Sequence, residues 1–97
     1  MMQRIQQQEQ ARDYNIASLK RQFPDLWMQL GEDFAFEYDW AIWTGEGSAI
    51  KDQPAFCYYG YTRTGGVHPD LVQALDRLGL YAEFRDPGTV FIWPREA

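Results

Sequence analysis

Cysteine and histidine are nearly absent from this sequence, with one of each among 97 residues. A single cysteine cannot close an intramolecular disulfide, and one cysteine with one histidine cannot supply the ligands of an ordinary zinc site. No apolar run reaches the roughly 18 residues that a membrane-spanning helix needs. The glutamine-rich start has no apolar stretch of the kind that secretory signals carry. We therefore expect a protein of the reducing cytoplasm, with no membrane contact, no metal and no cofactor.

Catalytic motifs are also missing. The glycine-rich pieces at residues 45–47 and 64–66 lack the lysine and following Ser/Thr of a phosphate loop. His68 directly precedes a proline, without the nucleophile and orienting carboxylate that a catalytic histidine needs, so we interpret it as a helix cap or turn residue. Cys57 has no neighbouring cation to activate its thiol, and we expect it to be a small buried hydrophobe. The sequence therefore predicts that the protein is not an enzyme.

Length and composition fit one domain spanning residues 1–97. The chain is 45% hydrophobic and 24% charged, which is typical of folded rather than disordered proteins. A chain of this size buries roughly two-thirds of its unfolded surface, enough for a single core. Residues 1–12 have little to bury, so we expect the start of the first helix to fray or to lie against a partner.

Hydrophobic periodicity predicts six main elements. A helix over residues 3–22 is broken by Pro24, which opens a second short helix ending at Gly31. Strict alternation over residues 34–43 predicts a half-buried strand, and an aromatic strand follows over residues 55–63. The remaining elements are a helix over 69–78, ended by Gly79, and a hairpin with strands 80–85 and 89–93.

These elements predict an α+β fold in the order α-β-β-α-β-β. A two-layer arrangement, with a four-stranded, mostly antiparallel sheet and the helices on one face, buries every apolar stripe through short connections. The strand order cannot be read from the sequence.

The negative charge is concentrated in one segment. The whole chain has a formal net charge of −5, and residues 32–52 alone hold six carboxylates against Lys51. A phosphate backbone would be repelled by such a segment, so we expect no direct nucleic-acid binding. An acidic surface can instead steer a basic protein toward it. The six carboxylates belong to Glu32, Asp33, Glu37, Asp39, Glu46 and Asp52.

Aromatic residues are abundant, at 16% of the chain. One sheet face takes about half of them as core, which leaves Trp43, Tyr81 and the pair Phe91 and Trp93 of the last strand on the other face. In the predicted strand over residues 34–43, Trp43 shares its face with Glu37 and Asp39, and the opposite face, which includes Phe36, is expected to turn toward the core. Aromatic anchors beside charged groups are typical of protein-binding surfaces. An alternative is that a second copy covers this face in a homodimer.

The sequence therefore favours a small, acidic, non-enzymatic protein that binds another protein. Inhibitors, immunity partners and counter-defence proteins of phages and mobile elements have this size and charge. We expect the acidic surface to mimic a phosphate backbone and to block a basic, nucleic-acid-binding surface of the partner. The predicted partner-binding residues are Glu32, Asp33, Glu37, Asp39, Trp43, Glu46, Asp52, Tyr81 and Trp93.

Two alternatives remain at this point. Glu37 and Asp39 lie two positions apart, roughly 7 Å along a strand, and paired carboxylates at such a distance can hold a divalent cation or act on a small ligand in an aromatic cleft. The glutamine-rich helix can also serve assembly, although its apolar seam is too short for a coiled coil.

Overall fold

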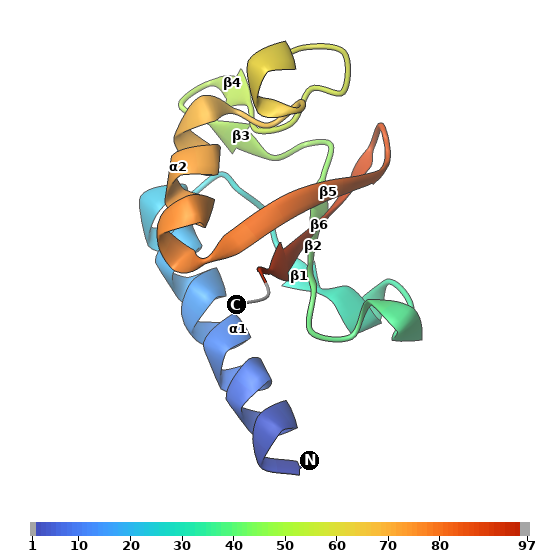
Figure 1. Cartoon of the computed structure of the whole chain (residues 1–97). Helices are drawn as coiled ribbons and strands as arrows, with labels where there is room; N and C mark the ends of the chain where they lie inside the picture. The colour runs from blue at the N-terminus through green and yellow to red at the C-terminus, as the bar shows by residue number, and fades with distance from the viewer. Residues whose placement is uncertain (1, 96–97) are drawn as a thin grey trace.

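The computed structural model describes residues 2–95, with side chains from residue 11 onward. The described fold consists of two α-helices, one main sheet and a small second sheet (Figure 1). The helices are α1 (Met2–Gln22) and α2 (Pro69–Leu78). The main sheet consists of β1 (Gln29–Leu30), β2 (Ile42–Gly45), β5 (Leu80–Asp86) and β6 (Thr89–Pro94). A small second sheet holds β3 (Ala49–Ile50) and β4 (Gln53–Pro54), and 3-10 turns lie at η1 (Gly31–Asp33), η2 (Phe36–Tyr38) and η3 (Thr62–Thr64).

The main sheet is antiparallel throughout, in the order β1-β2-β6-β5. After β2 the chain passes through the small sheet, α2 and β5 before β6 returns to lie beside β2. Ile42 then pairs with Ile92, and Trp43 pairs with Phe91. The α+β prediction with a four-stranded antiparallel sheet is confirmed.

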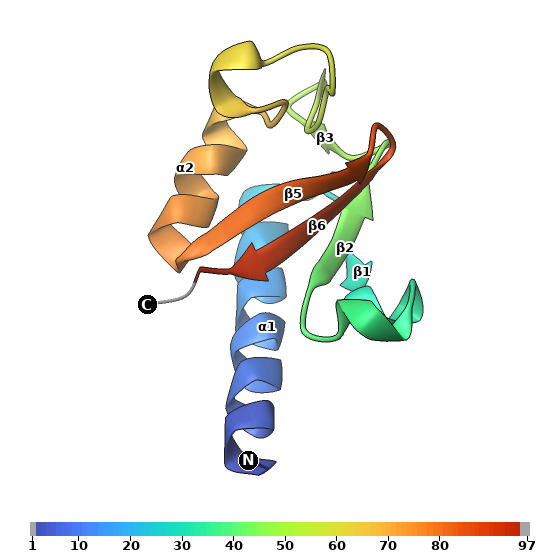
Figure 2. The same ribbon diagram turned by 45° about the vertical axis from the view of Figure 1, so that its right-hand side comes forward.

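Both helices pack on the same face of this sheet, as Figure 2 also shows. Ile42 and Ile92 supply the sheet side of the core, and Leu19 of α1 with Leu71 and Leu75 of α2 covers them. All five are almost completely buried. This apolar layer holds the fold together, because each buried aliphatic side chain contributes roughly 1.5–3 kcal/mol.

Helix α2 begins and ends as the sequence predicts. His68 is its N-cap, and the His68 Nδ1 accepts a hydrogen bond from the Asp70 amide at 3.1 Å. The His68 Nε2 lies 2.8 Å from Gln53 Oε1, which ties the helix start to β4. Gly79 ends the helix with φ 72, in the left-handed region that favours glycine. The predicted cap role of His68 and the β5–β6 hairpin are both confirmed.

The long strand predicted over residues 34–43 is wrong. Only Ile42 onward is a strand, and residues 31–41 form two 3-10 turns that connect β1 to β2. The Gly31 amide donates to the Ala41 carbonyl at 2.8 Å, which closes this connection at its base. Trp40 has a φ of 71, which no regular strand adopts. The expectation that Glu37, Asp39 and Trp43 share one strand face therefore fails as well.

Two further predicted elements are absent from the described structure. The short helix after Pro24 is a turn that leads directly into β1. The strand predicted over residues 55–63 is an irregular loop, with one isolated bridge between Phe56 and Val67 and a 3-10 turn at η3. Cys57 lies exposed in this loop, so its predicted burial is wrong.

The first turns of α1 extend beyond the body of the fold (Figure 1). The backbone is helical from Met2, in agreement with the predicted helix. The expectation that residues 1–12 fray or contact a partner lies largely outside the described residues, since side chains are described only from residue 11.

Candidate functional site

The sheet face opposite the helices carries the aromatic residues. Trp43 on β2, Phe91 on β6 and Glu83 on β5 are direct cross-strand neighbours, and Tyr81 pairs with Trp93 in the next row on the same face. Trp43, Tyr81 and Trp93 are each half-buried. The prediction that these three side chains lie on the outer face agrees with the structure.

Residues 31–41, called the flap from here on, fold over part of this outer face. The Tyr38 ring stacks on Phe91 with centroids 3.8 Å apart, and the Phe34 ring meets Phe91 edge-on at 5.3 Å. Phe91 is consequently only 1% exposed although it points away from the helices. Phe34 also contacts Trp43 edge-on at 5.1 Å, so the flap and the sheet share one aromatic cluster.

Arg85 fastens the flap from the side of β5. Its Nε donates to the Tyr38 hydroxyl at 3.2 Å, and its guanidinium carbon lies 5.0 Å from the centre of the Phe34 ring. The hydrogen bond to Tyr38 is the largest cause of a raised pKa for Arg85. The side chain thus combines a hydrogen bond with a cation–π contact, and both restrain the flap.

Arg12 of α1 fastens the other end of the flap. Its two terminal nitrogens donate to the two carboxylate oxygens of Glu32, at 2.6 and 3.0 Å. Arg12 is only 6% exposed. This bidentate contact lowers the pKa of the Glu32 carboxyl, against a smaller opposing effect of burial. Because both oxygens of the Glu32 carboxylate are held by Arg12, this carboxylate differs from the other flap carboxylates in already having a cationic partner.

The flap carries three other carboxylates and one strongly exposed aromatic side chain. Asp33 and Glu37 are exposed, Asp39 is half-buried, and Phe36 between them is 88% exposed. Among residues 11–95, no lysine or arginine nitrogen lies within 4.0 Å of these three carboxylates. The flap therefore combines one exposed apolar side chain with three carboxylates that form no ion pair within residues 11–95.

Glu46 and Asp52 lie apart from the flap. Glu46 follows β2 and its amide donates to the Gly88 carbonyl in the β5–β6 turn, whereas Asp52 is in the turn between β3 and β4. Figure 1 places the flap and the small sheet at opposite ends of β2. The acidic stretch of the sequence is thus divided between two regions of the molecule.

Phe36, Arg85 and Arg12 are the functional-site candidates that the sequence did not reveal. Phe36 was expected inside, because it follows the alternation over residues 34–43. The spacing of four between Phe34 and Tyr38, which both contact Phe91, is equally compatible with one face of a strand and gives no signal of a turn. Nothing local connects Arg12 with Glu32 or Arg85 with Tyr38, since these partners are 20 and 47 positions apart.

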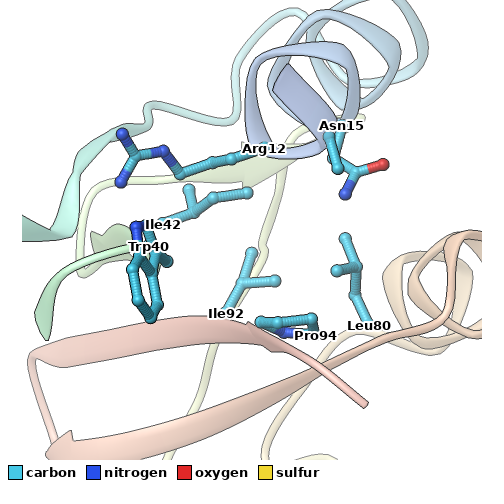
Figure 3. A pocket seen from close by; sticks show the side chains of 8 residues that line it. Arg12, Asn15, Trp40, Ile42, Leu80, Ile92 and Pro94 are labelled. Atoms are coloured by element: carbon cyan, nitrogen blue, oxygen red, sulfur yellow. The ribbon is translucent and has the colours of Figure 1, made fainter. Parts of the chain in front are cut away.

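Within the described residues, no group of three or more histidine, cysteine or acidic side chains is arranged to hold a metal ion. Neither described helix combines the length and hydrophobicity of a bilayer-crossing segment. Glu37 and Asp39 also do not line the apolar pocket between α1 and the sheet (Figure 3).

Comparisons with known proteins add no functional information. No protein-family model, no curated protein and no solved structure matches this chain.

Proposed function

We propose that this chain is a non-enzymatic protein-binding domain whose flap docks on a basic surface of a partner protein. The observation that carries the proposal is the 88% exposure of Phe36 among the carboxylates of Asp33, Glu37 and Asp39. An apolar aromatic side chain gains free energy when a partner removes it from water. Aromatic anchors of this kind dominate the binding energy of many protein interfaces.

The contacts that hold the flap against the rest of the fold support this role. Tyr38 and Phe34 pack on the sheet, Arg85 restrains them, and Arg12 holds Glu32 at the start of the flap. A segment held in place before binding loses little conformational entropy when the partner docks. Phe36 and its acidic neighbours are therefore presented on a preorganised element.

The charge indicates the chemistry of the partner. Asp33, Glu37 and Asp39 supply three of the carboxylates that give the chain its formal net charge of −5. Such a surface attracts lysine and arginine side chains and accelerates association with a basic protein. In the proposal, Glu46 and Asp52 extend the attractive field, while Trp93 and Tyr81 continue the contact surface along the outer face. Trp43 supports the flap from beneath.

We further propose that docking blocks the partner. A basic surface is typical of nucleic-acid-binding proteins, whose phosphate contacts come largely from lysine and arginine. Carboxylates around Phe36 imitate phosphates around an exposed base. The protein would thus act as an inhibitor, immunity or counter-defence protein, with the partner's nucleic acid as its competitor.

Affinity capture with flap variants tests the proposal. The parent chain, Phe36→Ala and the double variant Asp33→Lys/Glu37→Lys are each immobilised on a support. Each is then exposed to lysate of the source organism. We expect a basic protein that the parent retains, that both variants lose, and that added salt releases. A nucleic acid that binds the captured protein should displace it.

Two control variants match the flap variants. One removes an aromatic side chain of similar exposure, and the other makes the same change in net charge. Tyr59→Ala removes another aromatic side chain, 85% exposed and far from the flap in sequence. Asp13→Lys/Asp25→Lys reverses two exposed carboxylates on and after α1. Both controls should retain the partner. Retention of the same proteins by the flap variants and the parent would refute the proposal.

A further inference from the structure

A pocket of about 90 Å³ lies between α1 and the end of the main sheet (Figure 3). Ile42, Leu80 and Ile92 supply apolar surface from the sheet, and Arg12 and Asn15 approach from α1. Trp40, at the end of the flap, forms one wall. The pocket takes no part in the docking surface proposed above, and Phe36 is not among its lining residues.

Two nitrogen donors at this pocket have no hydrogen-bond partner among residues 11–95. The Nε of Arg12 and the Nε1 of Trp40 are both buried and both unsatisfied. In Figure 3 the indole nitrogen lies on the edge of the Trp40 ring that is turned toward Arg12. A buried donor without an acceptor destabilises the fold, so a group that accepts from either nitrogen would be favoured here.

The Arg12–Glu32 contact determines which acceptor fits. Glu32 already neutralises the guanidinium through both terminal nitrogens, and Nε is the guanidinium nitrogen that has no hydrogen bond within residues 11–95. A second anion would meet the carboxylate of Glu32 without a free positive charge to offset it. An uncharged oxygen with an apolar body matches both the two donors and the aliphatic walls.

We propose that this pocket binds a small uncharged molecule that has a compact apolar body and one carbonyl oxygen. The oxygen accepts hydrogen bonds from Trp40 Nε1 and Arg12 Nε, and the body lies against Ile42, Leu80 and Ile92. Because both nitrogens are closed off from solvent, the ring of Trp40 or the side chain of Arg12 shifts as the oxygen enters. The Trp40 indole resonance therefore reports occupancy directly.

The test is a titration of the whole ¹⁵N-labelled chain with cyclopentanone, followed through the tryptophan indole and arginine Nε–H resonances. We expect saturable shifts of the Trp40 indole, which is assigned as the signal that Trp40→Phe removes, and of Arg12 Nε–H. Trp40→Phe should also lower the affinity for cyclopentanone about tenfold, which is the effect of one lost hydrogen bond. In this variant the affinity is measured from the shift of the Arg12 Nε–H resonance. The same variant should leave the affinity for cyclopentane, which has no acceptor, within about twofold.

Two helix variants and an anion complete the test. Ala11 lines the pocket and Ala17 does not, although both lie on α1. Ala11→Leu should abolish the shifts and Ala17→Leu should preserve them, with circular dichroism showing the parent fold in both. Cyclopentanecarboxylate should bind at least tenfold more weakly than the ketone. The proposal is overturned by an absence of saturable shifts, by equal binding to the two leucine variants, or by equal affinity for the anion.

Discussion

The ring of Tyr38 lies stacked on the ring of Phe91, with centroids 3.8 Å apart and planes 2° apart. This contact joins the middle of the flap to the central part of the sheet. It also explains why a large side chain on the outer face, directed away from both helices, is buried. The flap thus acts as a third layer over one part of the sheet, and its stability depends on a few identifiable contacts.

Removal of the Tyr38 ring should loosen the flap. We expect Tyr38→Ala to lower the free energy of unfolding by about 3 kcal/mol, because it removes the stacking partner of Phe91 and exposes that ring. Tyr38→Phe keeps the ring and loses only the hydrogen bond from Arg85, so it should cost about 1 kcal/mol or less. Urea unfolding of the two variants beside the parent measures both values. Equal losses would mean that the stack contributes little.

The Arg12–Glu32 pair should make stability depend on pH. Since the folded-state pKa of Glu32 is lowered, its contribution is complete above the unfolded value of about 4.3 and is lost as the pH falls through the folded value. Glu32→Gln should therefore cost about 2 kcal/mol near pH 7 and much less near about pH 3. Urea unfolding at both pH values provides the measurement.

Glu37→Gln is the matched control for this pH dependence. Glu37 is exposed, and within residues 11–95 it forms no ion pair. We expect the unfolding of this variant to follow that of the parent at both pH values. A Glu32→Gln penalty that stays constant from neutral to acidic pH would contradict a stabilising carboxylate–guanidinium contact.

Gly31 should be intolerant of any side chain. A Cβ built there would lie 2.1 Å from the Tyr38 carbonyl oxygen and 2.8 Å from that of Ala41, and both are backbone atoms. Gly31→Ala must therefore open the base of the flap, and we expect a loss of about 3 kcal/mol or more. Gly65→Ala, where nothing lies within 4 Å but φ is 63, should cost only about 1 kcal/mol. Thermal unfolding of both variants decides between steric exclusion and ordinary backbone strain.

The His68 cap should contribute modestly to stability. His68→Ala removes the acceptor for the Asp70 amide, and such losses typically cost about 1 kcal/mol. Asn at this position offers an acceptor of similar reach, so His68→Asn should recover most of the loss. Urea unfolding of both variants provides the measurement, and equal destabilisation by Ala and Asn would point to the Gln53 contact instead.

Sequence patterns predicted the elements that are stabilised locally. Helix α2 has its proline start, its apolar stripe and its glycine end, and the β5–β6 hairpin has its turn residues. For both, short-range chemistry and the final fold favour the same conformation. The helical identity of residues 2–22 followed in the same way from the absence of glycine and proline.

The flap could not be predicted because its structure depends on distant residues. Its period-two aromatic pattern is typical of a strand, yet Phe34 and Tyr38 turn inward only because Phe91 and Arg85 lie opposite them. The positive φ of Trp40 likewise carries no signal in a tryptophan. For the candidate site, the sequence located the acidic segment and the outer aromatic residues but placed Phe36 in the core.

The most direct test of the proposed docking surface is the affinity of Phe36→Ala for the protein that the parent captures. Titration calorimetry with the purified partner gives Kd for the parent, for Phe36→Ala and for Tyr59→Ala. An anchor residue contributes about 2 kcal/mol or more, so Phe36→Ala should raise Kd at least about thirtyfold while Tyr59→Ala leaves it unchanged. A Kd for Phe36→Ala within about twofold of the parent value would contradict the assignment of the flap as the binding element.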